Sequence, residues 1–326
     1  MGIKFATITL NFLMENTNEA EAAITSVERM NAMTTLPQER ALETSEDVVL
    51  EQDWPTRSVL EFRNVSLRYC EGLPLALDGL CFTIQSGKRC GVVGQTGAGK
   101  TSLTATIFRL VEIEGGSILL DGIDLSTLEL ADVRGRQKGM AIIPQNPVLF
   151  AGTVRDCLDP SGTSNDEDML DALIAVRLAS TNNSRAVLDD IVEERGANYS
   201  VGERQLLCLA RAILSKPKIL VLDEATASVD GETDAFLQHM LRTNFQQGST
   251  LLTIAHRLNT IMDCDDVLVM DQGRAVEFGP PHELLSSNSG NSIFAELVDA
   301  TGAESSLVLR NMAKEAYEEK QRNLDC

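Results

Sequence analysis

The N-terminal stretch of the chain has apolar or small side chains in steps of three and four residues. This spacing places them on one face of a helix over residues 10–30, and they are Leu10, Leu13, Thr17, Ala20, Ile24 and Val27. Two interpretations stay open: the helix packs on the domain that follows, or it docks on something outside this chain. Residues 34–57 are acidic and contain Pro37 and Pro55, which predicts a linker.

From residue 59 the pattern changes to the alternation of β-strands. One alternating stretch runs from Leu60 to Tyr69 and is interrupted near Asn64, and similar stretches cover residues 80–84 and 118–120. These predict an antiparallel sheet. Short, wholly apolar runs then predict the buried parallel strands of an α/β core, and they cover residues 90–93, 140–143, 219–222, 251–255 and 267–270.

Helical patterns fill much of the remaining sequence. Residues 154–214 are mostly helical in pattern, and residues 282–322 again predict helices. We therefore expect an α/β domain over residues 54–300 with a helical insert at about 151–214. A helix and linker over residues 1–53 precede this domain, and a helical tail over residues 301–326 follows it.

Composition narrows the function classes. The chain has 326 residues, of which 43% are hydrophobic, and its net charge is -20. This charge excludes a broad nucleic-acid surface, which needs a basic stripe. Seven scattered cysteines without a C-x-x-C pair indicate free thiols in a reducing compartment. No run reaches the length that spans a bilayer, so we expect that the chain does not cross a membrane by itself.

The stretch from Gly94 to Thr101 matches the phosphate-loop pattern G-x-x-x-x-G-K-[ST] in full. It lies between a predicted strand and a predicted helix over residues 102–110, which is the context that the motif requires. Its glycines allow backbone N–H groups to turn toward phosphate oxygens, and the helix N-terminus favours the negative charge. The plain alternative is a tight glycine turn with an exposed lysine.

These properties predict a nucleoside triphosphate site. Lys100 reaches the β- and γ-phosphates, and the Thr101 hydroxyl takes a place on Mg²⁺. The residues expected to touch the nucleotide along the loop are Gly94, Gln95, Thr96, Gly97, Ala98, Gly99, Lys100, Thr101 and Ser102.

A second constellation follows the apolar run at residues 219–222. Asp223 ends this strand at the ligand crevice of an open α/β sheet, where it is placed to hold Mg²⁺. Glu224 faces differently and is placed to polarise a water for in-line attack on the γ-phosphate. Further upstream, Ser200 is the expected N-cap of a helix, and Gly202 allows close approach of a phosphate to that helix end.

Taken in order, these motifs resemble an ATP-binding-cassette nucleotide-binding domain. The order is the phosphate loop, Gln145, S-x-G-x-R-Q from Ser200, L-D-E-A-T from Leu222, and an isolated His256. The similarity runs from about Trp54 to Leu285. More narrowly, the sequence resembles the second nucleotide-binding domain of the C subfamily, the multidrug-resistance-associated group.

The resemblance implies an α/β fold: a P-loop NTPase cassette with a RecA-like parallel-sheet core, an antiparallel β subdomain and a helical subdomain. It also implies roles for matching positions. Tyr69 resembles the aromatic residue that stacks on adenine, and Gln145 resembles the loop glutamine that touches Mg²⁺ or water. His256 resembles the switch histidine at the γ-phosphate, and residues 228–230 resemble a loop that couples two cassettes.

The family mechanism implies partners. ATP on the phosphate loop of one cassette is closed over by the S-x-G-x helix of the other, and the motion drives attached membrane domains. The implied activity is ATP hydrolysis with Mg²⁺, powering export, at the cytoplasmic face of a membrane. Family members carry membrane domains and a first cassette on the same chain. Residues 10–40 resemble the end of the last membrane helix, so a C-terminal fragment, a truncated product or an incomplete gene model is expected.

The signature departs from the family pattern L-S-G-G-Q at Tyr199, Val201 and Glu203. Val201 puts a β-branched side chain where close backbone approach is normally needed, and Glu203 adds negative charge near the expected phosphate. A valine here is common in the second domain of the C subfamily, so the resemblance implies an asymmetric pair in which this signature caps a weaker site. Two other functions remain: a soluble cassette ATPase that does mechanical work, and a small-molecule kinase. The first usually carries two cassettes or a coiled coil, and the second leaves Gln145 and His256 unexplained.

Overall fold

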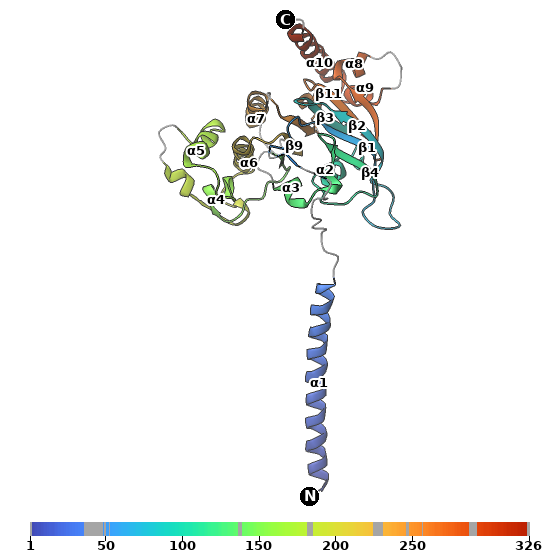
Figure 1. The fold of residues 1–326 in the computed structure, drawn as a ribbon, viewed down its shortest axis with the longest axis vertical. Helices are drawn as coiled ribbons and strands as arrows, with labels where there is room; N and C mark the ends of the chain where they lie inside the picture. Colours follow the sequence, from blue (N-terminus) through green and yellow to red (C-terminus); the bar gives the residue numbers. More distant parts are fainter. Residues whose placement is uncertain are drawn as a thin grey trace. The chain divides into compact units, whose positions relative to one another are not determined.

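The computed structural model describes residues 2–35, 48, 50–51, 53–135, 139–180, 185–223, 231–245, 248–255, 257–286 and 292–324. The chain divides into two compact units, residues 1–41 and 42–326. The first unit is helix α1 (Gly2–Thr34), blue in Figure 1, which confirms and lengthens the helix predicted over residues 10–30. Within the described part of the chain, no helix combines the length and the apolar character needed to cross a bilayer.

The second unit is built on a six-stranded sheet. In spatial order its strands are β12 (Arg274–Gly279), β11 (Asp266–Asp271), β3 (Arg89–Gly94), β10 (Thr250–Ile254), β9 (Ile219–Asp223) and β6 (Met140–Ile143). The five strands from β11 to β6 are parallel, which confirms the predicted core. The sequence did not predict β12, which pairs antiparallel with β11, because its charged residues Arg274 and Glu277 interrupt any apolar run.

The apolar runs are continuous because this sheet is covered on both faces. Successive side chains of a strand point to opposite faces. In β9, Val221 belongs to the apolar cluster shared with the antiparallel sheet, whereas Leu220 and Leu222 belong to the cluster shared with the helical segment. In β3, Val92 belongs to the first of these clusters, and Val93 packs with the C-terminal helices.

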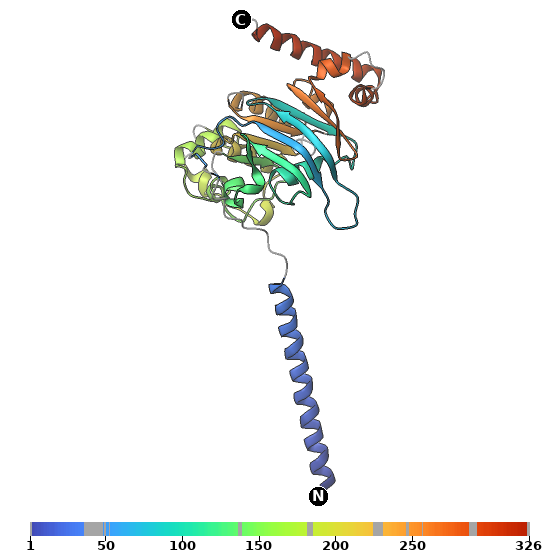
Figure 2. The same ribbon diagram turned by 45° about the vertical axis from the view of Figure 1, so that its right-hand side comes forward.

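The antiparallel sheet is confirmed, and Figure 2 shows its strands beside the core sheet. Its strands in spatial order are β2 (Leu77–Ile84), β1 (Leu60–Leu67), β4 (Gly115–Leu120) and β5 (Ile123–Asp124). The interruption expected near Asn64 is a shift in register between Phe62 and Val65, where Asn64 has φ 50°. After this break Val65 and Leu67 again point into the core.

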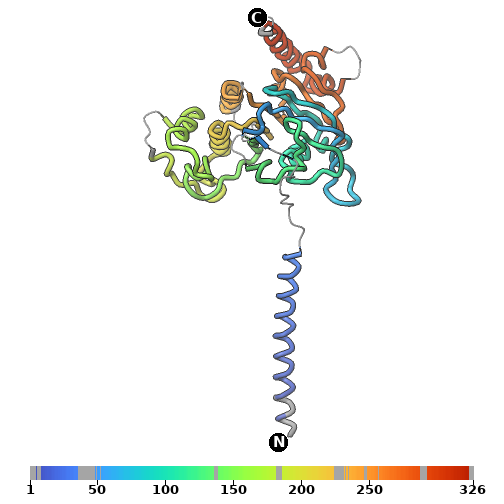
Figure 3. Tube along the Cα trace, viewed as in Figure 1, coloured from blue at the N-terminus to red at the C-terminus, as the bar shows by residue number. Residues whose placement is uncertain are grey.

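Helices cover the sheets in separate groups, as the traces in Figures 1 and 3 show. Their bounds are α2 (Lys100–Ile107), α3 (Leu130–Arg134), α4 (Val154–Leu158), α5 (Asp166–Ala175), α6 (Val201–Ser215), α7 (Gly231–Asn244), α8 (Pro281–Ser286), α9 (Ile293–Asp299) and α10 (Ala303–Leu324). Residues 154–214 are less helical than predicted. Strand β8 (Ile191–Val192) lies between α5 and α6 and pairs antiparallel with β7 (Gly152–Thr153), which precedes α4.

Candidate functional site

Four parallel strands of the core sheet end at the same edge. The register aligns Val92 of β3 with Ile254 of β10, and Ile254 with Asp223 of β9. It also aligns Leu222 of β9 with Ile143 of β6. Adjacent strands lie about 4.8 Å apart, so the phosphate loop after β3 and Asp223 are separated by about 10 Å across β10. Segments with candidate chemistry therefore meet at one sheet edge.

The phosphate loop needs glycine at defined points. A Cβ on Gly94 would lie 2.3 Å from the carbonyl oxygen of Met270, so only glycine allows this close approach of loop and β11. Gly97 has φ +86° and a Cβ there would meet nothing within 4 Å, so its backbone turns beside open space. Gln95, Thr96 and Gly97 are exposed, whereas Ala98 is buried beneath them. The loop is thus a cradle that opens outward.

Helix α2 begins directly after this loop without a side-chain cap. Its N-cap is Gly99, in a left-handed conformation, which has no side chain to accept a hydrogen bond from the first-turn N–H groups. These donors suit an anion, because a helix N-terminus carries unsatisfied N–H groups and a partial positive charge. Thr101 in the first turn is exposed, and Ser102 is buried.

Lys100 is the positive group of the loop. Its Nζ donates to the carbonyl oxygens of Gly94, at 2.8 Å, and of Gln95, at 3.2 Å. The residue is only 7% exposed, so the ammonium lies folded against the loop. An ammonium has three donors on a flexible stem and turns readily from these carbonyls to a phosphate.

Asp223 is the last residue of β9 and is partly exposed at the sheet edge. Its position after a buried strand is the one predicted for a Mg²⁺ ligand. Glu224 follows it directly in the sequence, and His256 follows Ala255 at the end of β10. Glu224, His256 and residues 228–230 lie outside the described residues, so their predicted roles stay predictions.

Gln145 follows β6 at the same edge and is partly exposed. The buried Gln205 of α6 donates from Nε2 to the main-chain carbonyl of Gln145, at 3.3 Å. This contact joins the glutamine segment to the helix that carries the signature. Sequence reasoning gave Gln205 no role of its own. The available signal was its polar side chain one helical turn before Leu209, on the apolar face of α6.

The N-terminus of α6 is closed by a capping box, which confirms Ser200 as the N-cap. The Ser200 hydroxyl accepts from the Glu203 N–H at 3.2 Å and donates to Glu203 Oε2 at 2.7 Å. The Ser200 N–H donates to the same carboxylate oxygen at 2.8 Å. Hydrogen bonds from the Ser200 side chain and main chain hold the pKa of Glu203 below its ordinary value. Val201 and Gly202 follow in the first turn.

Tyr69 lies just beyond the end of β1, with 49% of its surface exposed. Its hydroxyl lies 3.0 Å from the hydroxyl of Ser102 in the first turn of α2. The aromatic residue predicted for the base is therefore attached to the helix predicted for the phosphates. The sequence alone did not indicate this contact, because 33 residues separate its two ends.

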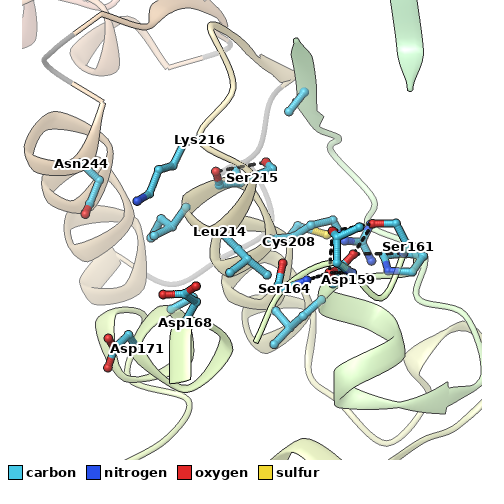
Figure 4. A pocket seen from close by; sticks show the side chains of 18 of the residues that line it. Asp159, Ser161, Ser164, Asp168, Asp171, Cys208, Leu214, Ser215, Lys216 and Asn244 are labelled. Carbon is cyan, nitrogen blue, oxygen red and sulfur yellow. Dashed lines mark hydrogen bonds between the residues drawn. The ribbon is translucent and has the colours of Figure 1, made fainter. Parts of the chain in front are cut away.

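A large cavity of about 780 Å³ lies elsewhere, between β6, α5, α6 and α7, and none of the predicted site residues lines it. Asp159 at its wall accepts hydrogen bonds from Ser161, Thr163 and Ser164, as Figure 4 shows in part. Burial raises the pKa of Asp159, but these bonds outweigh burial and hold it well below the ordinary value. The carboxylate shapes its own loop, and the cavity gathers no catalytic set.

Comparison with known proteins agrees with the motif order. Residues 77–227 match the family model described as ABC transporter. The chain is 46% identical over 291 residues to ATP-binding cassette sub-family C member 2 of Rattus norvegicus, covering 89% of this chain and 18% of that protein. It is 44% identical to ABC transporter C family member 3 of Dictyostelium discoideum, covering 91% of this chain and 20% of that protein.

The fold has a counterpart among solved structures. A bacterial Atm1-family ABC exporter with ATP bound matches with a TM-score of 0.75 and 30% identity, over 87% of this chain and 48% of that chain. These findings confirm the predicted cassette fold and the resemblance to the C subfamily. The chain spans about a fifth of the length of the curated relatives it matches.

Proposed function

The chain contains an ATP-binding domain of the ABC transporter family, and from that premise we propose that it binds and hydrolyses ATP as the C-terminal nucleotide-binding domain of an exporter. One observation carries the proposal. The phosphate loop at the end of β3, Asp223 at the end of β9 and Gln145 after β6 lie where these strands end at a single edge of the core sheet. The relatives' names and the ATP-bound exporter support the same function.

The residues present fit a nucleotide with Mg²⁺. The exposed loop from Gln95 to Gly97 and the first turn of α2 would hold the phosphates, and Lys100 would pair with their charge. The Thr101 hydroxyl, the Asp223 carboxylate and the Gln145 amide supply oxygen ligands, which Mg²⁺ prefers. When bound, the ion would neutralise charge that develops on the phosphate oxygens.

The chemical step is assigned to Glu224 and His256, which directly follow Asp223 and Ala255 in the sequence. Glu224 would accept a proton from the attacking water, and His256 would contact the γ-phosphate and that water. Tyr69 would stack on the adenine ring. Residues 228–230 would couple this cassette to its partner.

We further propose that the site is completed by a second cassette. The signature at Ser200 and Gly202 would close over ATP held by the partner's phosphate loop, while the partner's signature would close over the ATP held here. Membrane domains would be moved by this closure, with the cassette at the cytoplasmic face. The boundaries at residues 53 and 300 belong to the same proposal, with residues 1–53 leading from a membrane domain.

The capping box supports asymmetry between the two shared sites. The Glu203 carboxylate already occupies the Ser200 hydroxyl and N–H. A γ-phosphate must displace this carboxylate before it reaches the same donors, and the two negative charges repel each other. This chain would therefore supply strong catalytic groups to one site and a weak signature to the other.

The test compares ATP binding with ATP turnover in the purified chain. Glu224→Gln is expected to leave the ATP dissociation constant unchanged and to lower turnover by about 10²- to 10⁴-fold, the usual contribution of a general base. Glu315→Gln removes the same charge from an exposed position of α10 and is expected to keep wild-type turnover. Full turnover in Glu224→Gln would overturn the assignment.

Dilution tests the second cassette. If two copies or two cassettes must meet, ATP turnover per chain rises with protein concentration. Turnover that stays brisk and constant on dilution would contradict a shared site while leaving ATP hydrolysis intact. A phosphorylated small-molecule acceptor in place of free phosphate would indicate the kinase alternative.

A further inference from the structure

The contact between Tyr69 and Ser102 joins two parts of the second unit. Tyr69 follows β1 of the antiparallel sheet, and Ser102 lies in the first turn of α2, beside the phosphate loop. Their hydroxyl oxygens lie 3.0 Å apart. Ser102 is 7% exposed, so one end of the bond is fixed in the core, whereas the tyrosine is half exposed. The bond therefore holds a half-exposed side chain against a buried one.

The main chain around Tyr69 is held by its neighbours. Arg68 donates from Nε to Glu114 at 3.0 Å and also bonds the carbonyl of Leu73. The Leu73 N–H donates to the carbonyl of Cys70 at 3.2 Å, which closes the turn that directly follows the tyrosine. Neighbouring residues thus fix the backbone position of Tyr69, and the hydroxyl bond to Ser102 restricts the rotation of its side chain.

The hydrogen-bond chemistry leaves Ser102 able to serve both sides. A serine hydroxyl has one proton and two acceptor lone pairs. If the Tyr69 hydroxyl donates to Ser102 Oγ, the Ser102 proton remains available for an oxygen of a phosphate in the cradle. Bonds arranged in such a chain polarise and strengthen one another. Helix α2 directly follows the phosphate loop and carries the hydroxyl that holds the ring. It therefore fixes the distance between a base on the ring and phosphates on the loop.

We propose that Ser102 is a positioning residue that holds the Tyr69 ring for the base of a nucleoside triphosphate. The inference rests on the proposed function of the phosphate loop. Ring placement before binding lowers the entropy that binding must remove, so the tether adds to the affinity for ligands that carry a base. A contact that served only to join the two parts of the fold would not distinguish such ligands from a bare triphosphate.

The test measures two dissociation constants for each variant by calorimetry with Mg²⁺, one for ATP and one for inorganic tripolyphosphate. The dissociation constant for tripolyphosphate divided by that for ATP is the ratio that reports the contribution of the nucleoside. Tyr69→Phe keeps the ring and removes the hydroxyl, and is expected to reduce this ratio by about two- to tenfold, the weight of one hydrogen bond. Ser102→Ala is expected to reduce the ratio by a similar factor.

The double variant and a conservative variant complete the design. Because both single changes remove the same bond, Tyr69→Phe with Ser102→Ala is expected to reduce the ratio no further than either change alone. Ser102→Thr retains a hydroxyl and is expected to restore the ratio. If Ser102→Ala lowers the melting temperature too far for titration, Tyr69→Phe and Ser102→Thr decide the question.

An unchanged ratio in Tyr69→Phe, or additive effects in the double variant, would overturn the inference and leave the proposed function standing. A wild-type chain that binds neither ATP nor tripolyphosphate would overturn the proposed function and this inference with it.

Discussion

Two helix N-termini in this molecule face the same chemical problem and solve it differently. Helix α2 starts after Gly99 with no side-chain cap, and helix α6 starts after Ser200 with a closed capping box. Every helix leaves its first N–H groups without internal partners. In α6 a carboxylate of the same chain supplies the anion, whereas the N-cap of α2 is a glycine, which has no side chain to do so. The difference indicates that the N-terminus of α2, and not that of α6, is prepared to receive phosphate.

The same contrast extends to charge. The first residue of α2 is Lys100, whose ammonium donates to carbonyl oxygens of the loop before the helix, so an incoming anion meets a positive group. The first turn of α6 holds Glu203, so an incoming anion meets a negative group. In the proposed function, ATP binding would therefore depend on the first end, whereas pairing with another cassette would depend on opening the second.

The largest effect on ATP affinity is expected from Lys100→Ala. Loss of a charge-assisted hydrogen bond to phosphate costs about 1.5–3 kcal/mol, so the ATP dissociation constant should rise by about 10- to 100-fold. Calorimetric titration measures it. Lys314→Ala removes an exposed lysine of α10 as a matched control and should leave the constant unchanged. Equal affinities in Lys100→Ala and wild type would remove the basis for calling the α2 end the phosphate site.

Gly97→Ala should weaken ATP binding next. A side chain at φ +86° costs about 1–2 kcal/mol, and its methyl group would enter the open space of the cradle. The ATP dissociation constant should rise by about tenfold. Gly72→Ala serves as the control, because Gly72 has φ +85° and open space as well but lies outside the loop. The comparison fails if both variants lose affinity alike.

Ser200→Ala tests the closed end through stability. Removal of an N-cap hydroxyl costs about 1 kcal/mol of unfolding free energy, measured by urea denaturation. Glu203→Gln keeps a side chain that completes the box, since glutamine also serves at this position, and should change stability less. ATP-dependent association should increase in Glu203→Gln, because the competing charge is gone. A stability loss in Glu203→Gln as large as that in Ser200→Ala would show that charge, and not the cap, holds this end.

The smallest effect concerns pH. Hydrogen bonds from Ser200 lower the pKa of Glu203 in the folded state below the ordinary 4.5. The stability from the ionised carboxylate is therefore present above that value and is lost as the pH falls through the lowered pKa. A charge at a helix N-terminus contributes about 0.3–1 kcal/mol. The unfolding free energy of wild type should fall by this amount relative to that of Glu203→Gln between pH 6 and about pH 3. If the two unfolding free energies change in parallel with pH, the prediction is wrong.

Much of this architecture was predictable from sequence, for physical reasons. Continuous apolar runs mark strands buried on both faces, and they located β3, β6, β9, β10 and β11. The N-cap at Ser200 was predictable because capping depends on residues three positions apart. Strand β12 was not, because its residues alternate between half-buried and exposed, and its charges interrupt the apolar pattern. The sequence pattern predicted too much helix before α6, because the pairing of β7 with β8 joins two segments that are distant in the sequence.

The sequence by itself determined the elements whose causes are local: the phosphate loop, the buried strands and the cap of α6. Only the tertiary structure decided which distant residues meet. The parallel register brings the ends of β3, β9 and β6 to one edge, the Gln205 amide reaches Gln145, and the Tyr69 hydroxyl reaches Ser102. Such contacts depend on how the sheets and helices pack, and a linear pattern carries no record of a partner tens of residues away.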